Sequence, residues 1–239
     1  MISYALTDVG RTRQSNQDFY FVSDSPIGPL PNLFVIADGM GGHNAGDFAS
    51  RFCTESVVSF MRNAEEASPA DLFPQAVAAA NEELLAAASR DPELTGTGTT
   101  LILASLTPEG HLTVSNVGDS RVYLIRDSIE QLTRDHSYVE KMVSMGKMKV
   151  GSAEYMRKKN LITRAVGAAN AVPDIFEADL AAGDRVLMCT DGLTNMVSDE
   201  EILHVFRTES SVPQIVQKLV DMANVHGGRD NITALVIEA

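Results

Sequence analysis

Four aspartates, each beside a glycine- or asparagine-containing turn, lie at the borders of apolar, strand-like runs in this chain. They are Asp18, Asp38, Asp191 and Asp230. Short carboxylates at strand ends supply the oxygen ligands that hard cations such as Mg²⁺ prefer. Two carboxylates ~4 Å apart near a protein surface repel each other by about 4 kcal/mol, so several in one pocket need a counter-charge. The pattern therefore predicts a metal site, provided that the four strand borders meet in the fold.

The segment that begins at the second of these aspartates is the most specific motif. It reads Asp-Gly-Met-Gly-Gly-His over residues 38–43. A glycine turn between a strand and a helix is the plain alternative, because Asp and Gly are common turn residues. A nucleotide-binding loop does not fit, since the segment lacks Gly-Lys-Ser/Thr and the dinucleotide glycine spacing. A metal site fits better, because small residues after Asp38 let a backbone carbonyl such as that of Gly39 approach an ion without a clashing Cβ.

The other acidic positions each keep two interpretations. Asp191 and Asp230 precede Gly and Asn, which is common in turns, but their place at the edges of apolar runs favours ligands. Asp18 is either a ligand or an exposed loop carboxylate. Asp119, in Gly-Asp-Ser-Arg, is equally consistent with a tight hairpin turn and with a ligand.

Arg13 is the basic residue of most interest. A guanidinium fork matches phosphate oxygens bidentately, and an acidic chain needs such a local positive charge to bind phosphate; the alternative is a plain surface arginine. His43 and His136 are possible proton donors, or solvated and capping side chains. The sequence shows no nucleophile elbow, no Cys-x5-Arg loop and no His-Glu-x-x-His motif. Covalent catalysis and zinc chemistry are therefore disfavoured.

Charge and composition narrow the class of protein. The chain has 239 residues, 44% of them hydrophobic, and 32 acidic against 19 basic residues give a net charge of −13. Repulsion disfavours nucleic acid and anionic membranes as main partners. Cys53 and Cys189 are predicted to be free thiols, which suits a reducing compartment. Without a leader-like segment or an apolar run of membrane length, we expect a cytoplasmic protein without an anchor.

Apolar patterns indicate the elements that must position these residues. Residues 33–37 form a short apolar run that predicts a buried strand with Asp38 at its C-terminal edge. Asn44 is a suitable cap for a helix over 44–62, and Ser68 followed by proline predicts a second helix to about residue 89. A third helix is predicted over 211–225, ended by Gly227.

Further strands and a helical insertion complete the predicted order. The short connections favour two antiparallel hairpins among the segments from 99 to 126, and a third hairpin across Ala181-Ala182-Gly183 whose second strand delivers Asp191. Residues 135–160 carry a weak helical pattern, and no linker interrupts the chain. Grouped strands and helices predict an α+β arrangement of packed antiparallel sheets covered by helices. The predicted strands are 99–106, 111–117, 121–126, 173–180, 184–190 and 231–237.

Taken together, these motifs resemble those of the PPM family of metal-dependent protein phosphatases, the type 2C serine/threonine phosphatases, in particular the bacterial type. The resemblance covers the whole chain. It implies a four-layer α-β-β-α sandwich with two mostly antiparallel sheets, formed by a single domain over 1–239 with a flap-like helical insertion at about 138–160. The motifs that carry it are Arg13 with Asn16-Gln17-Asp18, Asp38 to His43, Gly98-Thr99-Thr100, Gly118-Asp119-Ser120-Arg121, Asp135-His136-Ser137, Ile162-Thr163-Arg164-Ala165, Asp191-Gly192-Leu193 and Gly228 to Thr233.

The resemblance also implies the reaction and the cofactors. Two Mn²⁺ or Mg²⁺ ions and their bridging water or hydroxide would hydrolyse phosphoserine and phosphothreonine in proteins by direct attack, opposing a Ser/Thr protein kinase. A third, weaker ion is implied as well. The implied roles are Asp38 as the ligand that bridges both ions, Asp191 and Asp230 as ligands of one, Asp18 with the Gly39 carbonyl as ligands of the other, Asp119 as the third-ion ligand, and Arg13 as the catalytic phosphate-binding residue.

Two features depart from the family pattern or leave alternatives. Met40 stands where animal members place the histidine of Asp-Gly-His, a proposed general acid, and His43, three residues on, does not by its position replace it. Metal-bound water or water on the third ion is the alternative proton donor. The insertion has basic residues that either select acidic phosphosubstrates or form a solvated helix face. These are Lys147, Lys149, Arg157, Lys158 and Lys159.

A catalytically silent binding module and a small-phosphoester hydrolase are the alternative functions, and a monomer is expected.

Overall fold

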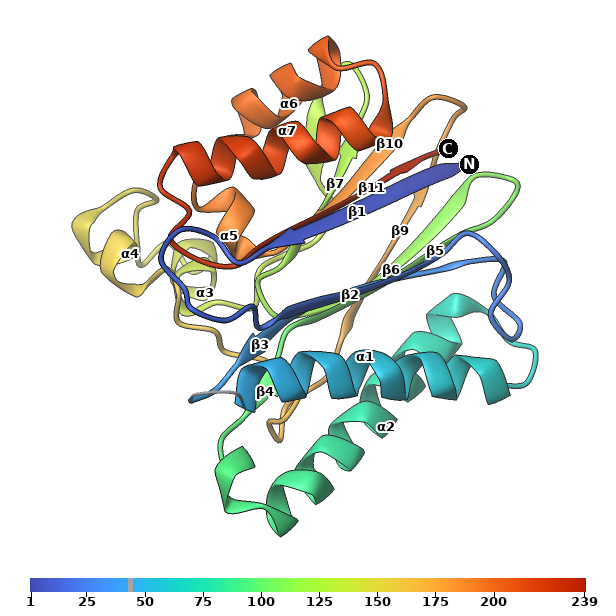
Figure 1. The fold of residues 1–239 in the computed structure, drawn as a ribbon, viewed down its shortest axis with the longest axis vertical. Coiled ribbons are helices and arrows are strands. Elements are labelled where there is room, and N and C mark those ends of the chain that lie inside the picture. Colours follow the sequence, from blue (N-terminus) through green and yellow to red (C-terminus); the bar gives the residue numbers. More distant parts are fainter. Residues whose placement is uncertain (43–44) are drawn as a thin grey trace.

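The computed structural model describes residues 1–42 and 45–239 and shows two antiparallel sheets packed face to face between layers of helices (Figure 1). The first sheet has the order β1 (Ile2–Asp8), β11 (Ile232–Glu238), β10 (Arg185–Cys189), β7 (Arg121–Ile125) and β8 (Ile129–Gln131). The second has the order β2 (Asp18–Ser23), β3 (Leu33–Met40), β5 (Leu101–Leu106), β6 (His111–Val117) and β9 (Asp174–Asp179), and β4 (Gly98–Thr99) pairs with β3. The predicted α-β-β-α sandwich is confirmed.

Three apolar clusters fill the three interfaces between the four layers. Along β3, Phe34 and Ile36 point into the cluster between the sheets, whereas Leu33, Val35 and Ala37 point toward the helices. Because both faces of the strand are buried, the run is continuously apolar and does not alternate. This explains why its strand was evident from the sequence.

Helices α1 (Ala45–Asn63) and α2 (Pro69–Arg90) cover the second sheet, as predicted. Ser68 begins α2 by accepting a hydrogen bond from the Asp71 backbone N–H. The predicted cap Asn44 lies outside the described residues. Helices α6 (Asp199–Thr208) and α7 (Val212–Val225) cover the first sheet, and α7 confirms the predicted third helix. A short 3-10 turn, η1 (Pro92–Leu94), follows α2.

Two of the three predicted hairpins are wrong, although β5 and β6 do pair as predicted. The turn at 118–120 joins β6 of the second sheet to β7 of the first, and the turn at 181–183 joins β9 of the second to β10 of the first. Strand β6 already pairs on both sides, with β5 and β9, so β7 has no free edge there. A short turn fixes a change of direction but does not determine which sheet receives the next strand.

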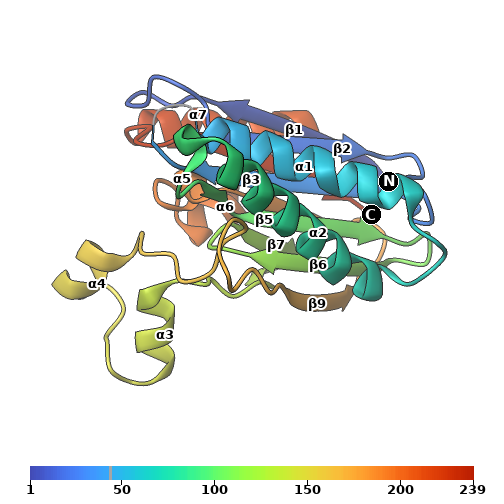
Figure 2. The same cartoon turned by 90° about the horizontal axis from the view of Figure 1, so that it is seen from below.

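The insertion contains the helices α3 (Tyr138–Ser144) and α4 (Ala153–Lys158), which confirms its helical character. Figure 2 shows both helices set apart from the sandwich. We refer to residues 138–160 as the flap segment. No helix in the described ranges is long and apolar enough to span a membrane. Both cysteines are buried free thiols, as expected.

Candidate metal centre

Chain topology brings the predicted acidic residues to one end of the sandwich. Strands β2 and β3 run antiparallel with Asp18 opposite Asp38, so the start of one strand faces the end of the other. Strand β3 extends past residue 37 to Met40, which places Asp38 inside the strand and not at its edge as predicted. Asp191 begins the short helix α5 (Asp191–Thr194) directly after β10, and Asp230 precedes β11, the neighbour of β10. Figure 1 shows these segments at the end of the sandwich that carries α3 and α4.

Asp18 is a buried carboxylate that two threonines hold in place. Thr233 Oγ1 donates to Asp18 Oδ2 at 2.6 Å, and Thr190 Oγ1 donates to the same oxygen at 2.8 Å. The other oxygen, Asp18 Oδ1, is buried and has no hydrogen-bond partner among the described residues. Burial raises the pKa of Asp18 to about 7, opposed by the two hydroxyls. The alternative of an exposed loop carboxylate is therefore wrong, because only 4% of Asp18 is exposed.

Asp38 lies at the centre of the acidic group. Burial raises its pKa well above the usual range, and four neighbouring carboxylates add to the shift. Like charges raise a carboxyl pKa in this way only across short distances. The structure therefore brings together all five predicted acidic residues. The four neighbours are Asp18, Asp191, Asp119 and Asp230.

Asp191 and Asp119 show the same conflict between burial and charge. Burial, followed by the charge of Asp230, raises the pKa of Asp191 to about 6, although Asn195 Nδ2 donates to Asp191 Oδ2 at 2.9 Å. Burial and then the charge of Asp191 raise the pKa of Asp119 to about 8. Asp119 Oδ1 is buried, and the described part of the chain offers it no hydrogen-bond partner. These groups would ionise readily only beside a positive charge.

Glycine 39 allows the close approach of backbone segments around the site. A Cβ built on Gly39 would lie 2.0 Å from the Gly46 carbonyl oxygen and 2.6 Å from that of Gln17. No real side chain occupies such space, so this position requires glycine. Likewise, a Cβ on Gly192 would lie 1.9 Å from the Asn231 carbonyl oxygen. The motifs Asp-Gly at 38 and 191 are thus constrained by packing as well as by turn geometry.

Arg13 lies at the rim of the acidic group. Its Nη2 donates to Asp230 Oδ2 at 2.9 Å, and half of its side chain is exposed. Asn231 anchors the loop that carries Arg13, because its Nδ2 donates to the carbonyls of Val9 and Ser15 at 3.0 Å. Its Oδ1 accepts from the Gln17 N–H at 2.9 Å. The guanidinium therefore lies beside the carboxylates on a fixed loop.

A cavity of about 230 Å³ lies between the acidic group and the flap segment. Lys159 reaches across it, and its Nζ donates to Asn195 Oδ1 at 2.5 Å, so Asn195 connects the flap segment to Asp191. Of the two histidines considered as proton donors, only His136 belongs to the described residues, and it does not line this cavity. His43 lies outside the described residues. Both ring nitrogens of His136 are engaged, by Gly118 and by Asp174.

Sequence reasoning missed the polar residues that orient the carboxylates. Thr190, Thr233, Asn195 and Asn231 stand next to or within predicted motifs, yet their partners are distant in sequence. The available signal was a threonine inside an otherwise apolar run, as at Thr233 in β11. A buried hydroxyl in such a strand needs a partner, and that partner here is Asp18 of the acidic group.

The donor set fits a hard divalent cation. All the converging side chains are carboxylates, and two of their buried oxygens lack partners within the described ranges. Such oxygens are ligands for Mg²⁺, Mn²⁺ or Ca²⁺. Across residues 1–42 and 45–239, however, no three His, Cys, Asp or Glu side chains lie close enough to hold an ion by themselves. An ion would need further ligands such as water or a backbone carbonyl, as is usual for Mg²⁺.

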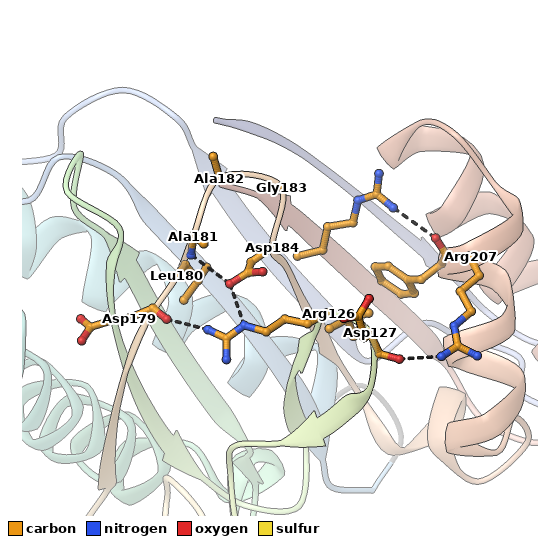
Figure 3. Close-up of a pocket in the computed structure, with 12 residues that line it drawn as sticks. Arg126, Asp127, Asp179, Leu180, Ala181, Ala182, Gly183, Asp184 and Arg207 are labelled. Carbon is orange, nitrogen blue, oxygen red and sulfur yellow. Dashed lines mark hydrogen bonds and ion pairs between the residues drawn. The ribbon is translucent and has the colours of Figure 1, made fainter.

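A separate cavity of about 720 Å³ lies at the opposite end of the strands (Figure 3). Arginines line it, but each already has partners. Arg126 donates to Asp184 Oδ2 and to the Asp179 carbonyl, both at 2.7 Å, and Arg207 donates to the Asp127 carbonyl at 2.5 Å. In Figure 3 the guanidinium groups of Arg126 and Arg207 lie apart and are turned toward different backbone carbonyls, so they do not converge on a single anion.

The converging carboxylates suit hard cations, and the half-exposed guanidinium of Arg13 beside them can take phosphate oxygens. These two features place the protein among metal-dependent phosphate-ester hydrolases. Comparison with known proteins supports this class. The family model for protein phosphatase 2C matches residues 10–235. The serine/threonine phosphatase stp of Listeria innocua is 34% identical over 97% of this chain and 93% of its own length.

Solved structures agree with the sequence relatives. The serine/threonine phosphatase of S. agalactiae has a TM-score of 0.91 at 33% identity, over 100% of this chain and 99% of that one. The catalytic domain of the serine/threonine protein phosphatase PstP in complex with two manganese ions has a TM-score of 0.86 at 32% identity, over 99% and 97% of the two chains. The chain therefore belongs to the protein phosphatase 2C family, and it is a serine/threonine phosphatase of that metal-dependent family.

Proposed function

We propose that the protein hydrolyses phosphoserine and phosphothreonine in protein substrates with two Mn²⁺ or Mg²⁺ ions held at the acidic group. Asp38 would be shared by both ions, Asp191 and Asp230 would hold one, and Asp18 with the Gly39 carbonyl would hold the other. One observation carries the proposal: desolvation, followed by the charges of four neighbouring carboxylates, raises the pKa of Asp38 well above its usual range. Divalent cations would relieve that repulsion.

The residues of the chain supply binding and orientation. When bound, the ions would supply Lewis acidity for activating water and for neutralising phosphoryl charge. Thr190 and Thr233 fix one oxygen of Asp18, which leaves the buried Oδ1 free to act as a ligand. Arg13 would bind the phosphoryl oxygens of the substrate, because its fork geometry matches them and it lies beside Asp230. Asp119 would hold a third, weaker ion through its unpartnered oxygen.

Several finer statements belong to the same proposal. The chain acts as one domain over 1–239, with the flap segment beside the cavity that adjoins Asp191. Its substrates are phosphoproteins made by a Ser/Thr kinase that it opposes. It works as a cytoplasmic monomer in bacterial signalling, without nucleic-acid or membrane partners. The two buried thiols suit a reducing compartment, and the net charge of −13 disfavours polyanions.

Hydrolysis of a phosphothreonine peptide tests the proposal. We expect phosphate release with Mn²⁺, none with chelator, and none with the Asp38→Asn variant. Asp221→Asn removes the same charge from an exposed position on α7 and is the matched control. Full activity of Asp38→Asn would refute the assigned site. Release from metabolite phosphates but not from the peptide would favour the small-phosphoester alternative, and no release in any metal would favour a silent binding module.

A further inference from the structure

The turn that carries Asp119 is attached to the centre of the acidic group from one side. Ser120 Oγ lies 2.8 Å from Thr100 Oγ1, and both side chains are buried. Thr100 Oγ1 also accepts from the Asp38 backbone N–H at 2.9 Å. The position of the turn is therefore set relative to Asp38 through two hydroxyl groups.

A buried histidine holds the same turn from the other side. The Gly118 N–H donates to His136 Nδ1 at 3.1 Å, and the His136 N–H donates to the Gly118 carbonyl at 2.9 Å. Because a backbone N–H can only donate, Nδ1 must be the acceptor, so Nε2 carries the ring proton. That proton is donated to Asp174 Oδ2 at 3.0 Å. Burial lowers the pKa of His136, which agrees with a neutral ring.

Asp174 in turn is fixed from two directions. It is the first residue of β9 and pairs with Asn116 of β6. Its Oδ1 accepts from Arg164 Nη1 at 2.7 Å. The ring of His136 therefore cannot rotate without breaking either the contact with Gly118 or the contact with Asp174.

His136 also lies where the two ends of the flap segment meet. The Thr163 N–H donates to the His136 carbonyl at 2.7 Å, and the Tyr138 N–H donates to the Leu161 carbonyl at 2.8 Å. This short ladder brings both ends of the flap segment together next to the Gly118 contact. The turn with Asp119 and the base of the flap segment are thus joined through one residue.

We propose that His136, oriented by Asp174, is a positioning residue that holds the Asp119 carboxylate in place for cation binding and ties it to the base of the flap segment. The inference rests on the proposed role of Asp119 as a cation ligand. The observation specific to this inference is that His136 Nδ1 accepts a hydrogen bond from the Gly118 N–H. Loss of this acceptor should make the turn more mobile, whereas loss of the Nε2 donor alone should have a smaller effect on the turn.

Two substitutions separate the two ring atoms. His136→Asn keeps an acceptor near the Nδ1 position, and His136→Gln keeps a donor near the Nε2 position. Mn²⁺ binding is measured by calorimetry on the full chain, with His111→Gln as the control, because His111 is a half-exposed histidine of β6 that also contacts two carboxylates. We expect His136→Gln to weaken the weakest Mn²⁺ step about fivefold, as for one lost hydrogen bond, and His136→Asn and the control to leave it within twofold.

A double mutant distinguishes positioning from general damage to the fold. If His136 acts through Asp119, His136→Gln should have no further effect on Mn²⁺ binding in an Asp119→Asn background. Additive effects, or equal loss in His136→Asn and His136→Gln, would overturn the inference.

Hydrogen exchange at the Gly118 amide in chelator tests the contact without any ion, and it should accelerate in His136→Gln but not in His136→Asn. Unchanged exchange in both would overturn the inference even if the phosphatase assignment holds. If exchange accelerates in His136→Gln but the wild-type protein binds no Mn²⁺, the contact between His136 and Gly118 is supported and the proposed metal site is refuted.

Discussion

The replacement of Asp191 by asparagine should stabilise the metal-free protein while it removes a proposed ligand. Burial and the nearby charge of Asp230 raise the pKa of Asp191 from 3.8 to about 6. A raised carboxyl pKa means that the folded protein keeps a proton which the unfolded chain has already lost, so stability falls as pH rises from about 4 to about 6. Above that window the folded protein carries the full cost of holding this partly desolvated charge beside Asp230.

The magnitude follows from the size of the shift. About two pKa units correspond to roughly 3 kcal/mol, since one unit is about 1.4 kcal/mol. Asparagine has nearly the same shape, and its side-chain oxygen can still accept from Asn195 Nδ2, which lies 2.9 Å from Asp191 Oδ2. For a chain of this size, 1 kcal/mol moves Tm by about 2–4 °C. We therefore expect a Tm gain of roughly 6–12 °C at pH 8 in chelator.

Thermal unfolding followed by circular dichroism checks this value. The gain should shrink at pH 5, where the wild-type carboxyl is already protonated in the fold. Asp221→Asn, with the same change in net charge at an exposed position, should shift Tm by less than about 2 °C, because exposed substitutions have small effects. With Mn²⁺ the order should reverse, because the ion stabilises only the wild type. A loss of Tm in chelator at pH 8, or an equal gain at pH 5 and pH 8, would refute the electrostatic reasoning.

Three further outcomes follow from single contacts. Thr233→Val removes a hydroxyl 2.6 Å from Asp18 Oδ2, and a hydrogen bond to a charged group contributes roughly 1.5–3 kcal/mol. The variant should therefore bind Mn²⁺ about ten- to a hundredfold more weakly in calorimetry, and wild-type affinity would contradict this. Arg13→Lys should raise KM for a phosphopeptide and the inhibition constant of free phosphate about tenfold, since the bidentate fork is lost, and an unchanged inhibition constant would remove the arginine from the site. Gly39→Ala should prevent stable folding in urea titrations, because its Cβ would lie 2.0 Å from a backbone oxygen, whereas Gly42→Ala, with open space around it, should fold normally.

The sequence predicted the elements that carry a strong local signal, such as a continuous apolar run or a helix cap. Strand β3 was evident because both of its faces are buried, and α2 because Ser68 and the proline after it form a cap and a first turn. Strands β1 and β2 were not predicted, since they are half-exposed edge strands with weaker apolar patterns. Helix α6 was also missed, although Ser198 and Glu201 form a capping box at its start. These misses concern elements at the edges and outer layers of the sandwich.

The sequence by itself also indicated which residues could bind cations, because it places short carboxylates beside glycine- or asparagine-containing turns, next to apolar runs. Tertiary structure alone decided how they are oriented. Thr190 and Thr233 lie 172 and 215 positions from Asp18 yet share one of its oxygens. It also decided that the turn of Asp119 crosses between the sheets. Hydrogen bonds and strand pairing between distant segments leave no periodic trace in the chain, because they depend on which layers pack together.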